Sequence, residues 1–399
     1  MMNTTKLRSF ALLVVFFCVA MAAMAQQNCP MGMETHFVPP NFPTMSGYGI
    51  CHLRLWDSDT AWINLETSNG VYNWSSLDTM LSEAQTLNSD VLYTFGKTPG
   101  WASSNPTDPN CTDGYHDGDC APPSDVNTGD NYFKAFVSAL VAHVGTQITY
   151  YEMWNEPYNL PYWDGTPQEL EIMVADAAAI IRAANPNAII ITPSISTWAN
   201  QQVFLQQFLT ACQGNVSFDV FGIHDYTWGG PAEAVVARVQ SAINFQKAVG
   251  LQALPLWGTE GSDKYWSTFT QQEKNDYVAR YYSLELNMGS LRHYWYSWDV
   301  ATVGELMNTP AATVYQTVGT WYDGRNALGC KNKKFDGGYE YQCTLQDTTD
   351  SSEYYVMWAT NGSTTFATKA STYMTDMGVV TPVVGGSVPI SDSPVLIQQ

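Results

Sequence analysis

The sequence predicts a (β/α)8 TIM barrel followed by a small C-terminal β-domain. Short apolar runs, typical of buried parallel strands, recur eight times between residues 32 and 298 of the 399-residue chain. Amphipathic helical patterns fill the stretches between them, which is the alternation of a βα protein. After about residue 325 the helical periodicity stops, and β-rich runs separated by Gly, Ser and Asn follow. Eight βα units in succession indicate a closed barrel.

The eight strand candidates carry β-branched or aromatic residues and are bounded by turn residues. They are Gly32–Phe37, Ile50–Leu55, Val91–Phe95, Thr149–Trp154, Ala188–Thr192, Val220–His224, Leu254–Gly258 and His293–Trp298. In such a barrel, the loops after the carboxyl ends of the strands form the functional face. The residues that follow these runs are therefore the candidates for chemistry.

Apolar side chains that recur at intervals of three and four residues predict helices between the strands. A capping box, Thr166 with Glu169, and Pro167 at the first helical position mark where one helix begins. The predicted helical segments contain Leu77–Ala84, Phe133–Val144, Pro167–Ile181, Pro231–Val249 and Gln271–Asn287.

The first 25 residues have the features of a secretory signal peptide. Lys6 and Arg8 precede an apolar run from Phe10 to Met24, and Ala23-Met24-Ala25 is a small-x-small cleavage site. The run is short for a membrane span. We therefore expect a secreted protein, extracellular or periplasmic. Its segments are the signal peptide at 1–25, the barrel domain at 26–325 and a β-sandwich-like accessory domain at 326–399.

The cysteines beyond this leader favour disulfides, because secretion exposes them to an oxidising environment. Cys111–Cys120 and Cys330–Cys343 are close in sequence, in loop-like or hairpin-like contexts, and Cys29–Cys51 is a further candidate pair. Cys212, at an apolar helix end, is then left as a buried free thiol. No C-x-x-C pair or His cluster has the spacing of zinc ligands, so we expect no metal and no cofactor.

The composition narrows the class of partner. Charged residues make up only 14% of the chain, and the formal net charge is -20. A surface so poor in cations is unsuited to nucleic acid, and to an anionic membrane after removal of the signal peptide. It suits a neutral ligand outside the cell. The oligomeric state stays open.

Two glutamates occur at equivalent points of the predicted barrel. Asn155-Glu156-Pro157 ends the fourth strand, and Thr259-Glu260-Gly261 ends the seventh. Because strands four and seven face each other across a barrel mouth, both carboxylates can reach one ligand from opposite sides. Glycosidic cleavage needs such a pair, one to protonate the leaving oxygen and one to attack or stabilise the oxocarbenium-like centre. The amide of Asn155 is placed to hold a sugar hydroxyl.

These motifs resemble the retaining glycoside hydrolases of the large (β/α)8 clan, and in particular family 39, the β-xylosidase and α-L-iduronidase branch with its bacterial relatives. Leu53–Asp57, Tyr72–Trp74 and Leu92–Ser103 also carry the resemblance, which covers about residues 32–300. It implies that Glu156 is the acid/base and Glu260 the nucleophile. It also implies retention of the anomeric configuration and carboxylates about 5–5.5 Å apart. The pKa of Glu156 is expected to be raised by burial and by the second carboxylate.

Other residues at the predicted strand ends fit roles beside these carboxylates. Arg54 ends the second strand and is expected to keep Glu260 ionised. By the resemblance, His224 and Tyr226 after the sixth strand flank the nucleophile. Because indole rings stack on the apolar faces of sugars, tryptophans at the mouth are expected to bind substrate. These are Trp298 at the end of strand eight and the loop residues Trp56, Trp101, Trp163 and Trp228.

The sequence thus predicts a secreted retaining glycoside hydrolase that cleaves a polysaccharide or oligosaccharide by double displacement. A non-catalytic carbohydrate-binding barrel and a transglycosylase remain as alternatives. The sugar and its linkage, exo or endo action, and the role of the C-terminal β-domain stay open at this stage.

Overall fold

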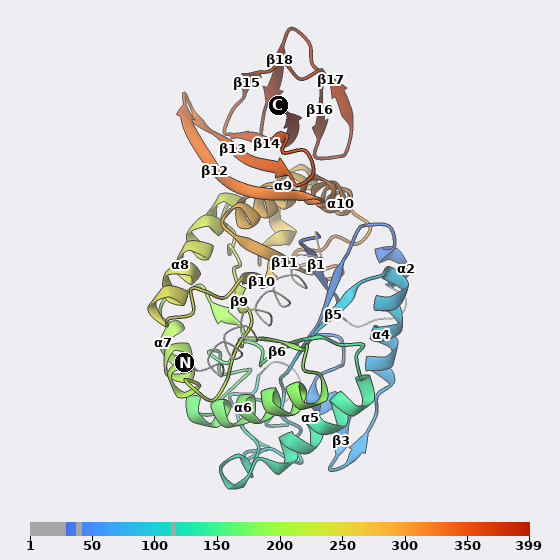
Figure 1. The fold of residues 1–399 in the computed structure, drawn as a ribbon, viewed down its shortest axis with the longest axis vertical. Helices are drawn as coiled ribbons and strands as arrows, with labels where there is room; N and C mark the ends of the chain where they lie inside the picture. The colour runs from blue at the N-terminus through green and yellow to red at the C-terminus, as the bar shows by residue number, and fades with distance from the viewer. Residues whose placement is uncertain (1–28, 37–41, 113–116) are drawn as a thin grey trace, which may run out of the picture.

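The computed structural model of the protein describes residues 29–36, 42–112 and 117–399. Figure 1 shows a barrel with the C-terminal strands stacked at one end, over the helices α9 and α10. The predicted signal peptide at 1–25 lies outside the described residues, as does Phe37 of the first predicted strand. Among the helices in the described ranges, none has the length and apolar character that crossing a membrane requires.

Eight parallel strands form the barrel, and all eight predicted strands are confirmed. β1 pairs with both β2 and β11, and a bridge between Ile191 and Val220 closes the barrel between β7 and β9. The short β8 (Ile195–Ser196) extends this seam along β9. The barrel strands are β1 (Met31–Glu34), β2 (His52–Leu55), β5 (Asp90–Thr94), β6 (Tyr150–Glu152), β7 (Ile189–Ile191), β9 (Phe221–His224), β10 (Leu256–Gly261) and β11 (Ser290–Tyr296).

The strand β10 runs further than predicted, through Glu260 to Gly261. Pairing continues past Gly258 because Glu260 lies opposite His224 of β9, and Gly261 lies opposite Trp295 of β11. The register shifts on both sides of this stretch, as at a β-bulge. The backbone of Glu260 is therefore held by a neighbouring strand on either side rather than by a loop.

Helices cover the outside of the barrel (Figure 1). The predicted capping box at Thr166 is confirmed, and Thr270 with Glu273 forms a second one at the start of α9. The sequence did not predict α10, which is rich in β-branched Thr and Val, residues of lower helix propensity. The described helices are α2 (Phe42–Met45), α3 (Trp62–Leu65), α4 (Ser75–Leu87), α5 (Asn131–Val144), α6 (Pro167–Ala184), α7 (Gln202–Ala211), α8 (Val235–Ala248), α9 (Gln271–Asn287) and α10 (Pro310–Tyr322), with 3-10 turns at Val126–Thr128, Ala232–Ala234 and Trp266–Thr268.

The C-terminal strands form two antiparallel sheets. Six strands pair in the order β12-β13-β14-β19-β16-β17, and β15 pairs with β18. Met357, Val388, Ile390 and Ile397 pack in a core that both sheets share. The strands are β12 (Arg325–Phe335), β13 (Gly338–Asp347), β14 (Glu353–Thr360), β15 (Thr364–Ala367), β16 (Thr372–Thr375), β17 (Val380–Pro382), β18 (Ser387–Ile390) and β19 (Val395–Gln398), and a small hairpin of β3 (Glu66–Ser68) and β4 (Val71–Tyr72) follows α3.

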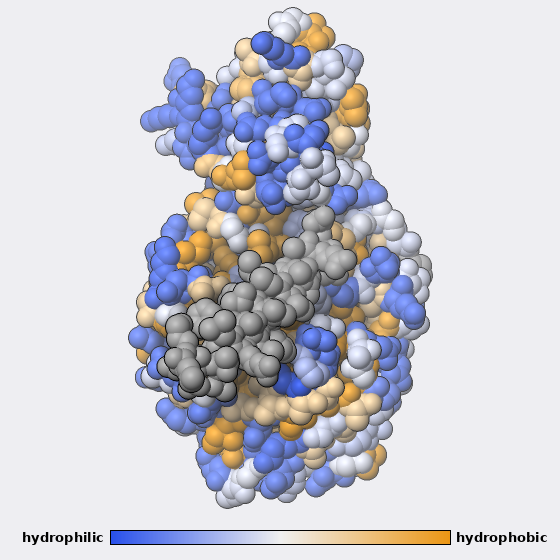
Figure 2. Space-filling model, viewed as in Figure 1, coloured by the Kyte–Doolittle hydropathy of each residue, from blue (hydrophilic) through white to orange (hydrophobic). Residues whose placement is uncertain are grey.

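The strand β12 was not predicted, because its sequence is largely polar. Lys331, Lys333 and Lys334 are exposed on it, and hydrophilic side chains gather where the β12–β13 hairpin projects in Figure 2. Because β12 lacks a buried apolar face, main-chain pairing with β13 along most of its length holds the strand instead.

The predicted disulfides are present. They join Cys29 to Cys51, Cys111 to Cys120, and Cys330 to Cys343, whereas Cys212 is a buried free thiol. The first ties the entry of β1 to the entry of β2, and the last joins residues that lie opposite each other on β12 and β13.

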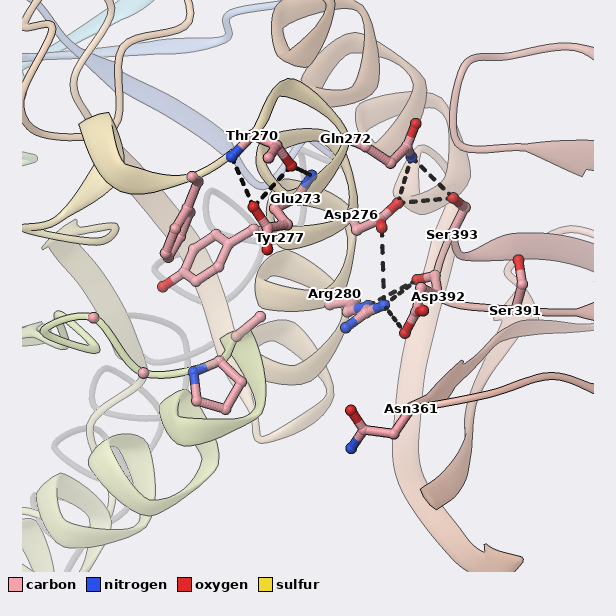
Figure 3. Close-up of a pocket in the computed structure, with 15 residues that line it drawn as sticks. Thr270, Gln272, Glu273, Asp276, Tyr277, Arg280, Asn361, Ser391, Asp392 and Ser393 are labelled. Atoms are coloured by element: carbon pink, nitrogen blue, oxygen red, sulfur yellow. Dashed lines mark hydrogen bonds and ion pairs between the residues drawn. The ribbon is translucent and has the colours of Figure 1, made fainter. Parts of the chain in front are cut away.

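The C-terminal sheet is attached to the barrel by both polar and apolar contacts. A cavity of about 670 Å³ lies at this junction, and Figure 3 shows residues that line it. Arg280 of α9 donates from Nε to the main-chain oxygen of Asp392 (2.9 Å) and from Nη2 to its carboxylate (3.0 Å). Ser393 donates to Asp276 of the same helix (2.8 Å). Trp358 and Leu396 of the sheet belong to the same buried apolar cluster as the barrel helices.

We expect Arg280→Met to destabilise the protein by about 1–3 kcal/mol, because hydrogen bonds to charged groups contribute on that scale. Asp392→Asn is the matched control. It keeps the main-chain acceptor of Arg280 and should cost less. Urea unfolding followed by tryptophan fluorescence measures both, and an unchanged stability of Arg280→Met would show that the guanidinium does not fasten this junction.

Candidate active site

The carboxyl ends of four barrel strands converge on the guanidinium of Arg54. This side chain, on β2, is fully buried. Its Nη1 donates to Glu34 of β1 and to Glu260 of β10, each at 2.7 Å. Its Nε donates to Glu152 of β6 (2.8 Å), and its Nη2 donates to the amide oxygen of Asn155 (2.7 Å). Arg54 therefore contacts both Glu260 on β10 and the residue that precedes Glu156.

Glu260 accepts hydrogen bonds on both carboxylate oxygens. Arg54 binds Oε2, and the hydroxyl of Tyr226 donates to Oε1 at 2.6 Å. His224 lies 3.7 Å from the same Oε1. Both oxygens of Glu260 therefore have a hydrogen-bond donor, and the two donors fix the orientation of the carboxyl group.

Glu156 follows β6 and faces Glu260 across the site. One oxygen of each carboxylate lies with a ring nitrogen of His224 in a group whose members are all within 4.8 Å of one another. Nδ1 of His224 is 2.7 Å from Oε1 of Glu156, to which the hydroxyl of Tyr158 also donates (3.0 Å). The amide of Asn159 donates to Oε2 at 2.7 Å.

The expectation of a raised pKa for Glu156 is wrong in this structure. Burial does favour the neutral acid. The hydrogen bond and charge of His224, the charge of Lys264 and the bond from Tyr158 outweigh burial, and they lower the pKa of Glu156 to about 2. The donors around Glu156 and the charge of Lys264 have no motif in the sequence, so only burial and the second carboxylate entered that expectation.

Glu34 is a site residue that the sequence analysis missed. It is fully buried, and its Oε1 has no hydrogen-bond partner among the described residues. Burial, with the charges of Glu260 and Asp57, raises its pKa well above the usual value although Arg54 lowers it. A neutral Glu34 reduces the number of negative charges around Arg54. Its place at the end of β1 was the available signal.

The backbone around Glu156 adopts unusual angles. Trp154 has φ +105° and Glu156 has φ +40°, both in the region that side chains with a Cβ rarely occupy. Hydrogen bonds on each side enforce this path, from Asn155 N to Phe95 O (3.0 Å) and from Glu156 N to Ser194 Oγ (3.3 Å). Such strain is typical of residues held for a function.

A cavity of about 390 Å³ opens over Glu156. Among the tryptophans predicted at the mouth, Trp228 lines it and is 49% exposed. The cavity wall also contains Trp198, which the sequence analysis did not select. Its other lining residues are mainly polar or aromatic, namely Thr112, Tyr158, Asn159, Pro161, Tyr162, Ser196, Gln201, His224, Tyr226 and Lys264.

The other predicted mouth tryptophans pack inside the protein instead. Trp298 is fully buried and donates to Thr44, and Trp163 packs edge-on against Trp154. Trp101 donates to the main chain of Glu66 and packs against Trp62 and Tyr132, while Trp56 packs against Tyr162 beneath Lys97. These large rings gain more by filling the gaps behind the mouth than by facing water.

The larger cavity at the domain junction is a weaker candidate for catalysis. Its carboxylates already have partners, since Asp392 binds Arg280 and Glu273 caps α9 through Thr270. We therefore place the candidate active site at Glu156 and Glu260.

The fold is shared with glycoside hydrolases of known structure. A family 39 glycoside hydrolase from the gut symbiont Bacteroides cellulosilyticus WH2 matches with a TM-score of 0.68 and 17% identity, over 93% of this chain and 81% of that chain. A family 39 β-xylosidase from Caulobacter crescentus gives 0.63 and 15%, over 93% and 96%. A family 30 endoxylanase from Clostridium papyrosolvens C71 gives 0.60 and 16%, over 92% and 95%. No protein-family model and no curated protein matches the chain.

The low pKa of Glu156 makes a prediction about acid stability. A carboxyl group whose pKa falls from 4.5 to about 2 on folding stabilises the protein above pH 4.5, and this stabilisation is lost as the pH falls towards about 2. His224→Gln removes its principal partner. The difference in free energy of unfolding between wild type and variant should therefore shrink over that interval.

Thermal unfolding at a series of pH values measures this difference. His143→Gln is the matched control, because His143 pairs with Asp78 on the surface and exposed pairs contribute little. A difference for His224→Gln that does not change with pH would contradict the assigned ion pair.

Proposed function

We propose that the protein is a secreted retaining glycoside hydrolase that works by double displacement, with Glu156 as acid/base and Glu260 as nucleophile. The facing carboxylates carry this proposal. Their nearest oxygens, within 4.8 Å of each other, suit the separation of about 5–5.5 Å typical of retaining enzymes better than the roughly 6.5–9.5 Å of inverting ones. The shared fold with families 39 and 30 supports the same reading.

In the first step Glu260 attacks the anomeric carbon of the sugar. Arg54 holds Oε2 of Glu260 from within the core, so Oε1 is the oxygen that faces the cavity side and His224. A bond forms between this oxygen and the anomeric carbon, and the bond from that carbon to the leaving oxygen breaks. Tyr226 keeps Oε1 in place before attack. The product is a covalent glycosyl-enzyme.

Glu156 must give a proton to the leaving oxygen in the same step, although alone it is ionised at neutral pH. We infer that the proton is held between Glu156 and His224, whose nearest atoms are 2.7 Å apart. His224 passes it to Glu156 as the leaving oxygen gains charge. In the second step Glu156 takes a proton from water, which displaces Glu260 and releases the sugar with its configuration retained.

A carbohydrate substrate fits the cavity. Trp228 and Trp198 offer apolar rings, and Asn159 and Gln201 offer planar hydrogen-bonding groups beside Glu156. Structural neighbours include a β-xylosidase and an endoxylanase, so xylosides and xylan are the first substrates to test. Secretion is supported by the signal-like leader and by three disulfides.

We expect Glu260→Ala to reduce kcat on an aryl glycoside by a factor on the order of 10⁴ or more, as for loss of a catalytic nucleophile. Added azide should restore turnover and give a glycosyl azide of inverted configuration, identified by NMR. Glu353→Ala, at an exposed glutamate of β14, is the control. Full activity of Glu260→Ala would refute the assignment, and sugar binding by wild type without cleavage would favour the non-catalytic alternative.

Two tyrosine variants separate the roles of the carboxylates. Tyr226→Phe removes a bond to Glu260 and should lower kcat about 10–100-fold, the effect of losing about 1.5–3 kcal/mol. The loss should be similar for all leaving groups. Tyr158→Phe alters Glu156 instead, so its effect should depend on the leaving-group pKa. A series of aryl glycosides measures both, and identical patterns would contradict the two roles.

A further inference from the structure

A second cluster of titratable side chains lies behind the candidate active site, within the barrel wall. Asp225 follows β9, Glu285 is on α9, and His293 is on β11, and all three are fully buried. One ligand atom from each lies within 4.8 Å of the other two. These residues come from three separate elements, so they have no metal-ligand spacing in the sequence.

Most polar atoms of this cluster face only each other. Oε1 of Glu285 and Oδ2 of Asp225 are buried with no hydrogen-bond partner among the described residues, and Nδ1 of His293 contacts Oε2 of Glu285. Nδ1 of His293 is 2.7 Å from Glu285 and 4.0 Å from Asp225. No Lys or Arg of the described chain forms an ion pair with either carboxylate. Unpaired buried carboxylates are costly, so the cluster requires a cation or protons.

His293 is oriented as a metal ligand. Its Nε2 lies 3.2 Å from the carbonyl oxygen of Gly261, which can only accept, so Nε2 carries the hydrogen. With the hydrogen on Nε2, the neutral ring has its lone pair on Nδ1, which lies on the side of Glu285 and Asp225. A histidine that binds a metal through one nitrogen commonly donates from the other to a carbonyl in this way.

The surroundings also fit an ion. The hydroxyl of Tyr281 donates to Oδ1 of Asp225 at 2.6 Å, a supporting contact typical of a ligating carboxylate. The rings of Tyr281, Tyr282 and Trp295 pack around His293 and exclude water. A Cβ at Gly258 would overlap Glu285 and His293, and one at Gly261 would overlap Asp225, so glycines leave the space open.

We propose that Asp225, Glu285 and His293 bind a divalent transition-metal cation of the Zn²⁺ type. An imidazole with two carboxylates suits such an ion better than Ca²⁺ or Mg²⁺, which prefer all-oxygen sites with more ligands. The ion would join β9, β11 and α9 beside Gly261 of β10, and so brace the strand that carries Glu260. Because the cluster is enclosed, the ion must enter during folding.

Protons are the competing occupants. Burial, with the charge of Glu285, raises the pKa of Asp225 to about 7, and burial raises that of Glu285 to about 8. Ser290, Tyr281, Tyr282 and His224 are the other polar or titratable groups that act on the cluster. Near neutral pH a metal-free protein would hold a proton mostly on Glu285 and only partly on Asp225.

The test is the metal content of the whole protein, unfolded with a chelator and refolded with or without Zn²⁺, then desalted. We expect about one zinc ion per chain by mass spectrometry, and a higher Tm for the zinc-refolded protein. Refolding with Co²⁺ should give the visible absorption bands of a nitrogen and oxygen site. Wild-type protein that keeps no metal, with equal Tm in both preparations, would overturn the proposal even if no variant folds.

Variants locate the ion. Glu285→Gln and His293→Gln should each lower the zinc affinity about tenfold or more. Glu260→Gln tests the other cluster of potential ligands, Glu156, His224 and Glu260, and should keep its zinc. Zinc lost from Glu260→Gln but kept in Glu285→Gln would refute the buried site. These measurements do not use glycosidase activity, so they succeed or fail independently of the proposed function.

Discussion

The buried guanidinium of Arg54 is the interaction on which the candidate site depends. Removing a charge from water costs several kcal/mol, and partners of good geometry must offset that cost. Arg54 meets this requirement with the carboxyl groups of Glu34, Glu152 and Glu260, on β1, β6 and β10, and with the amide oxygen of Asn155. The need to pair the buried charge of Arg54 therefore fixes the position of each partner. The orientation of Glu260 and of the loop that carries Glu156 follows from these hydrogen bonds to Arg54 rather than from loop packing.

The chain as a whole is acidic, whereas basic side chains surround the two facing glutamates. The protein carries a formal charge of -20, yet Arg54, His224 and Lys264 lie around the two facing glutamates. The contacts of Glu156 with His224 and Tyr158 and the charge of Lys264 outweigh burial and lower its pKa. Under the proposed function, Glu156 and His224 share the proton that is donated, so a carboxyl group with a low pKa can still act as an acid.

The sequence predicted what local patterns determine, and missed what tertiary packing determines. The barrel strands and the Thr166 cap follow from periodicity and capping chemistry. Functional residues of a barrel lie at the carboxyl ends of its strands, and this placed Glu156, Glu260, Arg54, His224 and Tyr226 together. A position at a strand end does not determine which way a ring points, and four of the five selected tryptophans pack inward. Glu34 and Lys264 have no motif, because their importance arises only from neighbours far along the chain.

The apolar cluster that runs from the barrel helices into the C-terminal sheet has a consequence for how the chain is divided. Trp358 and Leu396 are buried against barrel residues, and Trp358 also donates to Glu233 beside α8. Because the C-terminal sheet shares its core with the barrel, it is not an independently folding domain that could be exchanged for another. The sheet and the barrel should melt in one cooperative transition, and shortening the chain before β12 would remove part of the barrel's own interior.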